Sequence, residues 1–160
     1  MAKWTSSYIL DILENHDMEL HALNRQLETL GEMLEADLEE IRHRVYPGAV
    51  RYDQERVQSS PDPGGSLVAV VQACDERREQ HKRDVQSILA RLRDIRAVYS
   101  AIQRLDAVGK VTLLSLYYPR KSTDKVAEGM GIDCKTVWRR RDKAVESLKD
   151  YFSEMSDDVR

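Results

Sequence analysis

The sequence has few of the residues that form metal sites, redox motifs or disulfide frameworks. Two of its 160 residues are cysteines, Cys74 and Cys134, and neither belongs to a CxxC pair or has a pair of histidines nearby. This spacing gives no support to a zinc site or a redox motif, so we expect two reduced thiols. We therefore expect no metal and no cofactor.

Residues that break helices or favour strands are also scarce. The chain has four prolines, seven glycines, one phenylalanine and 6% aromatic residues, whereas 41% of it is hydrophobic and 33% is charged. This balance is typical of a helical protein and argues against a β-sandwich. The length suits one domain or two small helical units.

Several longer patterns are missing as well. No run of about 18 apolar residues exists, and the N-terminus has no basic stretch followed by an apolar one, so we expect a cytoplasmic protein without membrane contact. The sequence contains no phosphate-binding glycine loop, no nucleophile elbow and no clustered histidine and aspartate ligands. We therefore expect no enzymatic activity.

The charge that is present is distributed unevenly. Residues 1–109 contain 14 basic and 19 acidic side chains, residues 110–149 contain 10 and 5, and residues 150–160 contain 1 and 4. The middle segment is thus a basic block inside a chain of net charge −3. Such an asymmetry indicates a polyanionic partner for that block alone.

Two apolar heptad patterns predict long amphipathic helices. The first runs from Ile9 to Val45 and is stopped by Pro47, and the second runs from Val71 to Ile102 after Gly64-Gly65-Ser66. Their matched lengths predict a long antiparallel helical hairpin, similar to a coiled coil, with a stripe left over for self-association. The alternative is a coiled coil between chains without the hairpin.

Two histidines, His16 and His81, occupy positions in these patterns. In an antiparallel hairpin they would lie far apart, so we interpret them as polar interruptions of the apolar stripe rather than as metal ligands. Residues 46–66 between the helices are rich in proline and glycine and predict a connecting loop. The sequence leaves open whether Val57 to Pro61 bind a specific surface.

After Ile102 the pattern predicts shorter helices. An apolar helix from Leu105 to Tyr118 ends before Pro119, and a short helix follows that Ser122 can cap and Gly131 ends. A longer basic helix, which Asp133 can cap, begins at Cys134. Ala127, Gly131 and Val137 have the spacing of a helix-turn-helix, in which the second helix lies in the DNA major groove. The alternative is a three-helix bundle with a solvated basic face.

The segment LLSLYYPRKSTDKVAEGMGIDCKTVWRRRDKAVESL resembles the promoter-reading region 4 of sigma-70-type factors. Over most of its length the chain is similar to small bacteriophage regulators of the ArpU and RinA type. The fold class implied is all-α, with a hairpin in residues 1–104, a helix-turn-helix domain in residues 105–152 and an acidic tail in residues 153–160.

This resemblance implies a phage transcription regulator that binds double-stranded promoter DNA and activates late genes with host RNA polymerase. The residues that it implies face the DNA groove are Lys135, Thr136, Trp138 and Arg139, with Asp142 and Lys143 one turn on. Phosphate contacts are expected from Arg120, Lys121 and Lys125. Sigma-like helices usually have an aliphatic residue at the position of Arg140, so its head either reaches a phosphate or pairs with a carboxylate.

Other functions fit parts of the same pattern. A small terminase subunit for DNA packaging also combines a helix-turn-helix with helical oligomerisation. A coiled-coil adaptor without a nucleic-acid role would use the long helices alone. Footprinting separates a terminase subunit from a transcription regulator. The salt dependence of DNA binding separates a coiled-coil adaptor from a DNA-binding protein.

Overall fold

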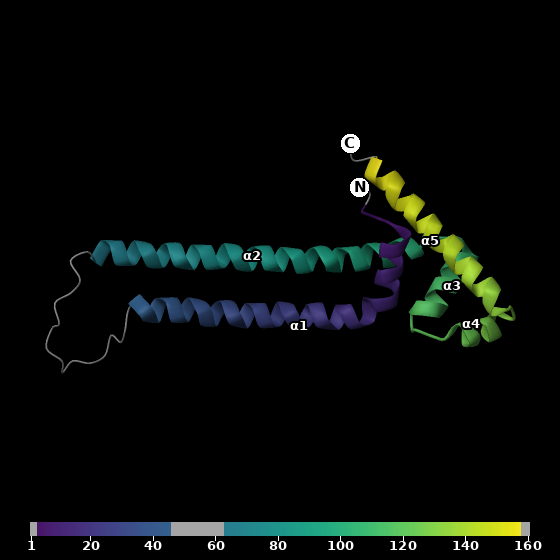
Figure 1. Cartoon of the computed structure of the whole chain (residues 1–160), viewed down its shortest axis with the longest axis horizontal. Helices are drawn as coiled ribbons and strands as arrows, with labels where there is room; N and C mark the ends of the chain where they lie inside the picture. Colours follow the sequence, from purple (N-terminus) through teal and green to yellow (C-terminus); the bar gives the residue numbers. More distant parts are fainter. Residues whose placement is uncertain (1–2, 46–62, 158–160) are drawn as a thin grey trace. The chain divides into compact units, whose positions relative to one another are not determined.

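The structure is a computed structural model that describes residues 3–45 and 63–157. In these ranges the chain is all-helical, as the sequence predicts (Figure 1). The five helices are α1 (Ser6–Val45), α2 (Pro63–Ile102), α3 (Ala107–Tyr117), α4 (Thr123–Met130) and α5 (Cys134–Asp157).

The chain divides into two compact units. One consists of residues 1–20 and 91–160, which we call the terminal unit, and the other of residues 21–90, which we call the long-helix unit. Both α1 and α2 pass from one unit into the other. These units differ from the predicted domains, whose boundary lay between residues 104 and 105.

The core of the terminal unit is made by α3 and α4 packing against α5, together with the ends of α1 and α2. Leu113, Val137 and Leu148 are completely buried. Gly109 allows α3 to approach α5 closely, because a Cβ atom at this residue would lie 3.3 Å from the Cβ of Ala144.

The first residues of the chain belong to this core. Ile9, Ile12 and Leu13 are buried, and the Trp4 ring stacks on Phe152 of α5 with 3.9 Å between ring centroids. The Ser6 hydroxyl also donates a hydrogen bond of 3.0 Å to a carboxylate oxygen of Glu146. The start of α1 is therefore packed against α5.

Charged groups attach the start of α1 to the end of α2. Arg91 donates hydrogen bonds of 2.7 Å to Glu19 and to Asp11, and those to Glu19 raise the pKa of the guanidinium most. The half-buried hydroxyl of Tyr8 donates to Asp94 at 2.6 Å, and burial is the main reason that its pKa is raised.

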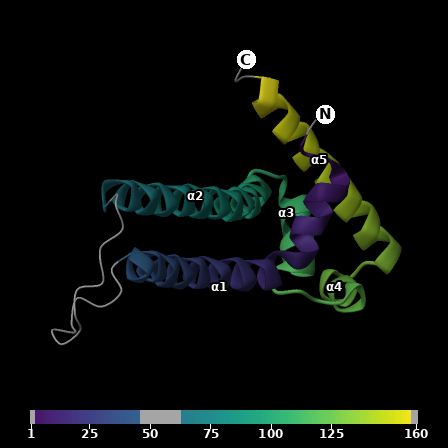
Figure 2. The same ribbon diagram turned by 60° about the vertical axis from the view of Figure 1, so that its left-hand side comes forward.

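In the long-helix unit, residues 21–45 of α1 and 63–90 of α2 lie side by side (Figures 1 and 2). Arg77 of α2 pairs with Asp37 of α1 at 2.5 Å. Of the side chains that the structure describes in this unit, only Cys74 is buried. The unit therefore has a much smaller core than the terminal unit.

Several boundaries differ from those predicted. α2 begins at Pro63, ahead of the predicted start after Ser66, because proline is well suited to the first position of a helix. α5 continues to Asp157, so residues 153–157 extend the helix instead of forming a tail. The remainder of the predicted loop, residues 46–62, lies outside the described residues, as do residues 158–160.

No helix in the described ranges is long and apolar enough to cross a lipid bilayer.

Candidate functional site

A tight glycine turn joins α4 to α5. Gly131 has φ 64° and ψ 34°, a left-handed conformation that suits glycine because a Cβ atom would strain the backbone. Its amide donates to the carbonyl oxygens of Ala127 and Glu128, and the Ile132 amide donates to Ala127 at 3.0 Å. The role predicted for Gly131 in the turn is confirmed.

The two predicted helix caps differ in outcome. Ser122 precedes α4, but its hydroxyl makes no capping hydrogen bond, and only its carbonyl accepts from the Val126 amide, at 3.1 Å. Asp133 precedes α5, where a hydrogen bond from the Thr136 side chain is the main cause that lowers the pKa of the Asp133 carboxyl. The cap at Asp133 therefore fixes the first turn of α5, whereas Ser122 does not act through its side chain.

The outer face of α5 is polar and mostly basic. Its buried side is formed by Val137, Ala144, Val145 and Leu148, as the sequence predicts for all four. The residues predicted to face the DNA groove lie away from this core, and all but the half-buried Thr136 are exposed: Lys135, Trp138, Arg139, Asp142 and Lys143. Cations thus dominate the first three turns of the exposed face.

The ion-pair partner of Arg141 lies within α5. Its Nε and Nη2 donate to one carboxylate oxygen of Asp142 at 2.8 and 2.5 Å. The guanidinium also lies 4.3 Å from the ring centroid of Trp138, and its side chain is only 18% exposed. Burial raises the pKa of the neighbouring Tyr117, and the charge of Arg141 opposes this. Arg141 therefore holds Trp138 and Asp142 in place.

A groove lies between α5 and the start of α4, and we call it the α4 groove. It has a volume of about 500 Å³ and brings together three of the predicted residues, Arg120, Lys121 and Trp138. Ser122 and Thr123 also line it. Two acids, Glu14 and Asp124, line the same groove, so its positive charge is largely balanced.

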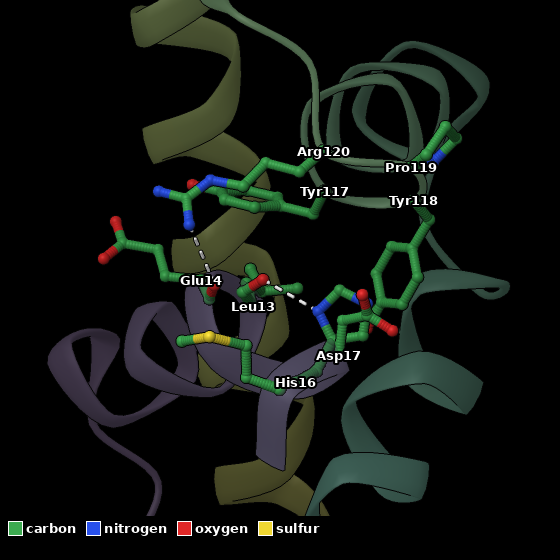
Figure 3. Close-up of a pocket in the computed structure, with 9 residues that line it drawn as sticks. Leu13, Glu14, His16, Asp17, Tyr117, Tyr118, Pro119 and Arg120 are labelled. Carbon is green, nitrogen blue, oxygen red and sulfur yellow. Dashed lines mark hydrogen bonds between the residues drawn. The ribbon is translucent and has the colours of Figure 1, made fainter. Parts of the chain in front are cut away.

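Figure 3 shows the cavity of about 460 Å³ that adjoins this groove. Nη1 of Arg120 reaches the backbone carbonyl of Glu14 at 3.4 Å, so the start of α1 steadies this arginine. The buried His16 ring lies 4.0 Å from the Tyr118 ring, and Nδ1 of His16 is 3.0 Å from the Leu13 carbonyl. His16 is therefore part of the core that supports Arg120.

A second groove lies between α5 and the start of α3, and we call it the α3 groove. It has a volume of about 320 Å³ and contains three cations, those of Arg139, Arg140 and Lys143. Its one acid, Asp106, caps α3 by accepting a hydrogen bond of 3.2 Å from the Gly109 amide. Among the described residues, no ion pair joins any of the three cations to a carboxylate.

The remaining predicted residue, Lys125, is exposed on α4 and lines neither groove. The sequence reasoning missed Glu14, Asp106 and Ser147, which line the grooves. Asp106 could have been recognised as the cap of the helix before the turn, because aspartate is a favoured cap. Nothing in the spacing of Glu14 indicates that the start of α1 lies beside α4.

Comparison with protein-family models, with curated proteins and with solved structures gives no match to this chain. In the described part of the chain, no three histidine, cysteine, aspartate or glutamate side chains lie close enough together to hold a metal ion.

Proposed function

We propose that the chain binds double-stranded DNA through α4 and α5, which act as a helix-turn-helix, and that it regulates transcription. The observation that carries this proposal is the exposed basic face of α5 directly after the Gly131 turn. In a helix-turn-helix the second helix enters the major groove with its N-terminal residues toward the bases. Arg139 is the residue best placed for this, since arginine can bind O6 and N7 of guanine together.

The resemblance to sigma-70 region 4 and to ArpU and RinA regulators makes the proposal more specific. On this basis the DNA is a phage promoter, the regulator activates late genes, and host RNA polymerase is a partner. Residues 21–45 and 63–90 then form the long helical hairpin outside the DNA-binding unit. Lys121 and Arg120 in the α4 groove support the same assignment, because phosphate contacts usually position the recognition helix.

Comparing Arg139→Ala with Lys121→Ala tests the DNA-binding role. We expect Arg139→Ala to reduce the preference for a selected site over random DNA by roughly 1–3 kcal/mol, because a base contact is lost. Lys121→Ala should weaken the binding of selected and random DNA equally. It should also reduce the slope of log affinity against log salt concentration by about one. Binding sites selected from random DNA, followed by mobility shifts at several salt concentrations, provide the measurement.

Two outcomes would overturn parts of this proposal. Identical effects of both substitutions on selected and random DNA would mean that Arg139 does not read bases. Binding that is absent, or independent of salt, would remove the DNA-binding role and favour a helical adaptor. Footprinting on phage DNA then separates regulation, with protection upstream of a promoter, from packaging, with protection at a packaging site.

A further inference from the structure

The two grooves lie on opposite flanks of α5. Trp138 lines the α4 groove and Arg140 lines the α3 groove. Residues two positions apart on an α-helix point in directions that differ by about 200°, which leaves them about 160° apart around the axis. A duplex approached by the outer face of α5 would therefore meet one groove on each side of the helix.

The α3 groove is the more basic of the two. Arg139, Arg140 and Lys143 face a single acid there, whereas two acids oppose Arg120 and Lys121 in the α4 groove. Asp106 also accepts a hydrogen bond from the Gly109 amide that it caps. The half-buried Arg140 lines this groove next to Ala144, so its stem lies at the edge of the core while its charge has no ion-pair partner in the described ranges.

Major-groove geometry gives these flanks different targets. The major groove of DNA is about 12 Å wide, and its two walls are the phosphate backbones of opposite strands. A helix with side chains is about 10–12 Å across, so it fills the groove and each flank faces one wall. Contacts to these walls fix the register of a protein on DNA without reading its sequence.

Given the proposed DNA-binding function, we infer that the α3 groove is a second phosphate site, in which Arg140 and Lys143 bind the backbone of one strand. Lys121 in the α4 groove binds the backbone of the other strand. α5 is thereby held between both strands, and the cation at residue 140 serves this purpose where a sigma-like helix has an aliphatic side chain. Ser147 lies at the end of the α3 groove, where its hydroxyl donates to the backbone carbonyl of Lys143 at 3.1 Å.

Neutral methylphosphonate linkages placed one at a time along each strand of a selected duplex test this inference. With the full-length wild-type chain, we expect sensitive positions on both strands, each weakening binding by roughly threefold or more at low salt. With the variants Arg140→Gln and Lys143→Gln, neutral linkages on one strand should no longer weaken binding, whereas neutral linkages on the other strand should weaken it as in the wild type. Lys121→Gln should show the reverse pattern.

Lys149→Gln is the matched control, because Lys149 is a cation of α5 that lines neither groove and pairs with Glu146. We expect it to keep the wild-type pattern, and thermal unfolding checks that each variant is folded. The inference would be overturned if Arg140→Gln and Lys121→Gln both removed the effect of neutral linkages on the same strand. It would also be overturned if Arg140→Gln and Lys143→Gln left the effects of the linkages on both strands unchanged. In either case the proposed DNA binding would still stand. A wild-type chain that does not bind the duplex would overturn the proposed function itself.

Discussion

At the scale of single residues, Gly109 controls how closely α3 packs against α5. A Cβ atom at this position would lie 2.7 Å from Oδ1 of Asp106 and 3.3 Å from the Cβ of Ala144. The cap on α3 and the helix contact would both have to shift. The α3 groove therefore depends on a glycine at this position.

We expect Gly109→Ala to lower the free energy of unfolding by about 1–3 kcal/mol. Overpacking costs about 1–3 kcal/mol and a lost cap about 1 kcal/mol, whereas the better helix propensity of alanine returns about 1 kcal/mol. Gly129→Ala is the control, since a Cβ atom there would have open space around it, and it should be neutral or stabilising by up to about 1 kcal/mol. Urea unfolding measures both, and equal stabilities would show that the contact at Gly109 relaxes without cost.

The Tyr118 ring contacts His16 and Tyr99, and its buried hydroxyl has no hydrogen-bond partner among the described residues. Burial, followed by the charge of Tyr99, raises the pKa of Tyr118 to about 12. The folded protein then holds this proton more tightly than the unfolded chain, whose tyrosine pKa is about 10. The resulting stability is fully present below pH 10 and is lost as the pH rises toward 12.

Tyr118→Phe should therefore change the stability differently at neutral and alkaline pH. Near pH 7 we expect it to be neutral or to stabilise by about 1 kcal/mol, because an unpaired buried hydroxyl is removed. Between pH 10 and pH 12 the variant should lose less stability than the wild type. Urea unfolding across this range measures the difference, and parallel losses in the two proteins would contradict the role assigned to the Tyr118 hydroxyl.

At the scale of the helices, the start of α1 contributes to the same core as α5. Ile12 is completely buried, and the Trp4 ring stacks on Phe152. Both tryptophans of the chain, Trp4 and Trp138, lie in the terminal unit, so their fluorescence reports its unfolding alone.

We expect Ile12→Ala to destabilise the terminal unit by about 2–5 kcal/mol through the cavity that it leaves. Met18→Ala is the control on the same helix, because Met18 is 72% exposed, and it should change the stability by less than about 0.5 kcal/mol. Tryptophan fluorescence during urea unfolding gives both values. Equal stabilities for the two variants would mean that the start of α1 is not part of this core.

These helices also show what could be predicted from the sequence. Heptad spacing predicts α1 and α2, and the spacing of Ala127, Gly131 and Val137 predicts the turn and the buried side of α5. Periodicity identifies an apolar face but not its partner, so the packing of α1 against α5 could not be foreseen. The pairing of Arg141 with Asp142 was missed for a local reason, because adjacent helical residues do not normally face each other.

At the scale of the whole molecule, the long-helix unit has an apolar surface that two helices alone do not bury. Its α1 leucines are only half-buried, at positions 23, 27, 30, 34 and 38. A groove of about 450 Å³ opens beside Leu30 and Ile88, and it is also lined by Ala22, Arg25, Gln26 and Thr29. The helix from His21 to Val45 is about 37 Å long, and two helices side by side are about 20 Å wide. One face of the pair therefore has an area of about 740 Å². Two such faces would bury about 1,500 Å², which is a standard size for a stable interface.

We therefore expect the chain to associate with a second copy through this face. A symmetric dimer would cover the groove at Leu30 and Ile88 with the same face of the other chain, so that each dimer would have two terminal units. Leu30→Asp and Ile88→Asp should each shift the chain toward the monomer, because a carboxylate would replace an apolar contact and would lose its hydration in the interface. Ser87→Asp, at the exposed neighbour of Ile88, should leave the association unchanged. Sedimentation equilibrium over a range of concentrations measures this, and a wild-type chain that stays monomeric throughout would refute the interface.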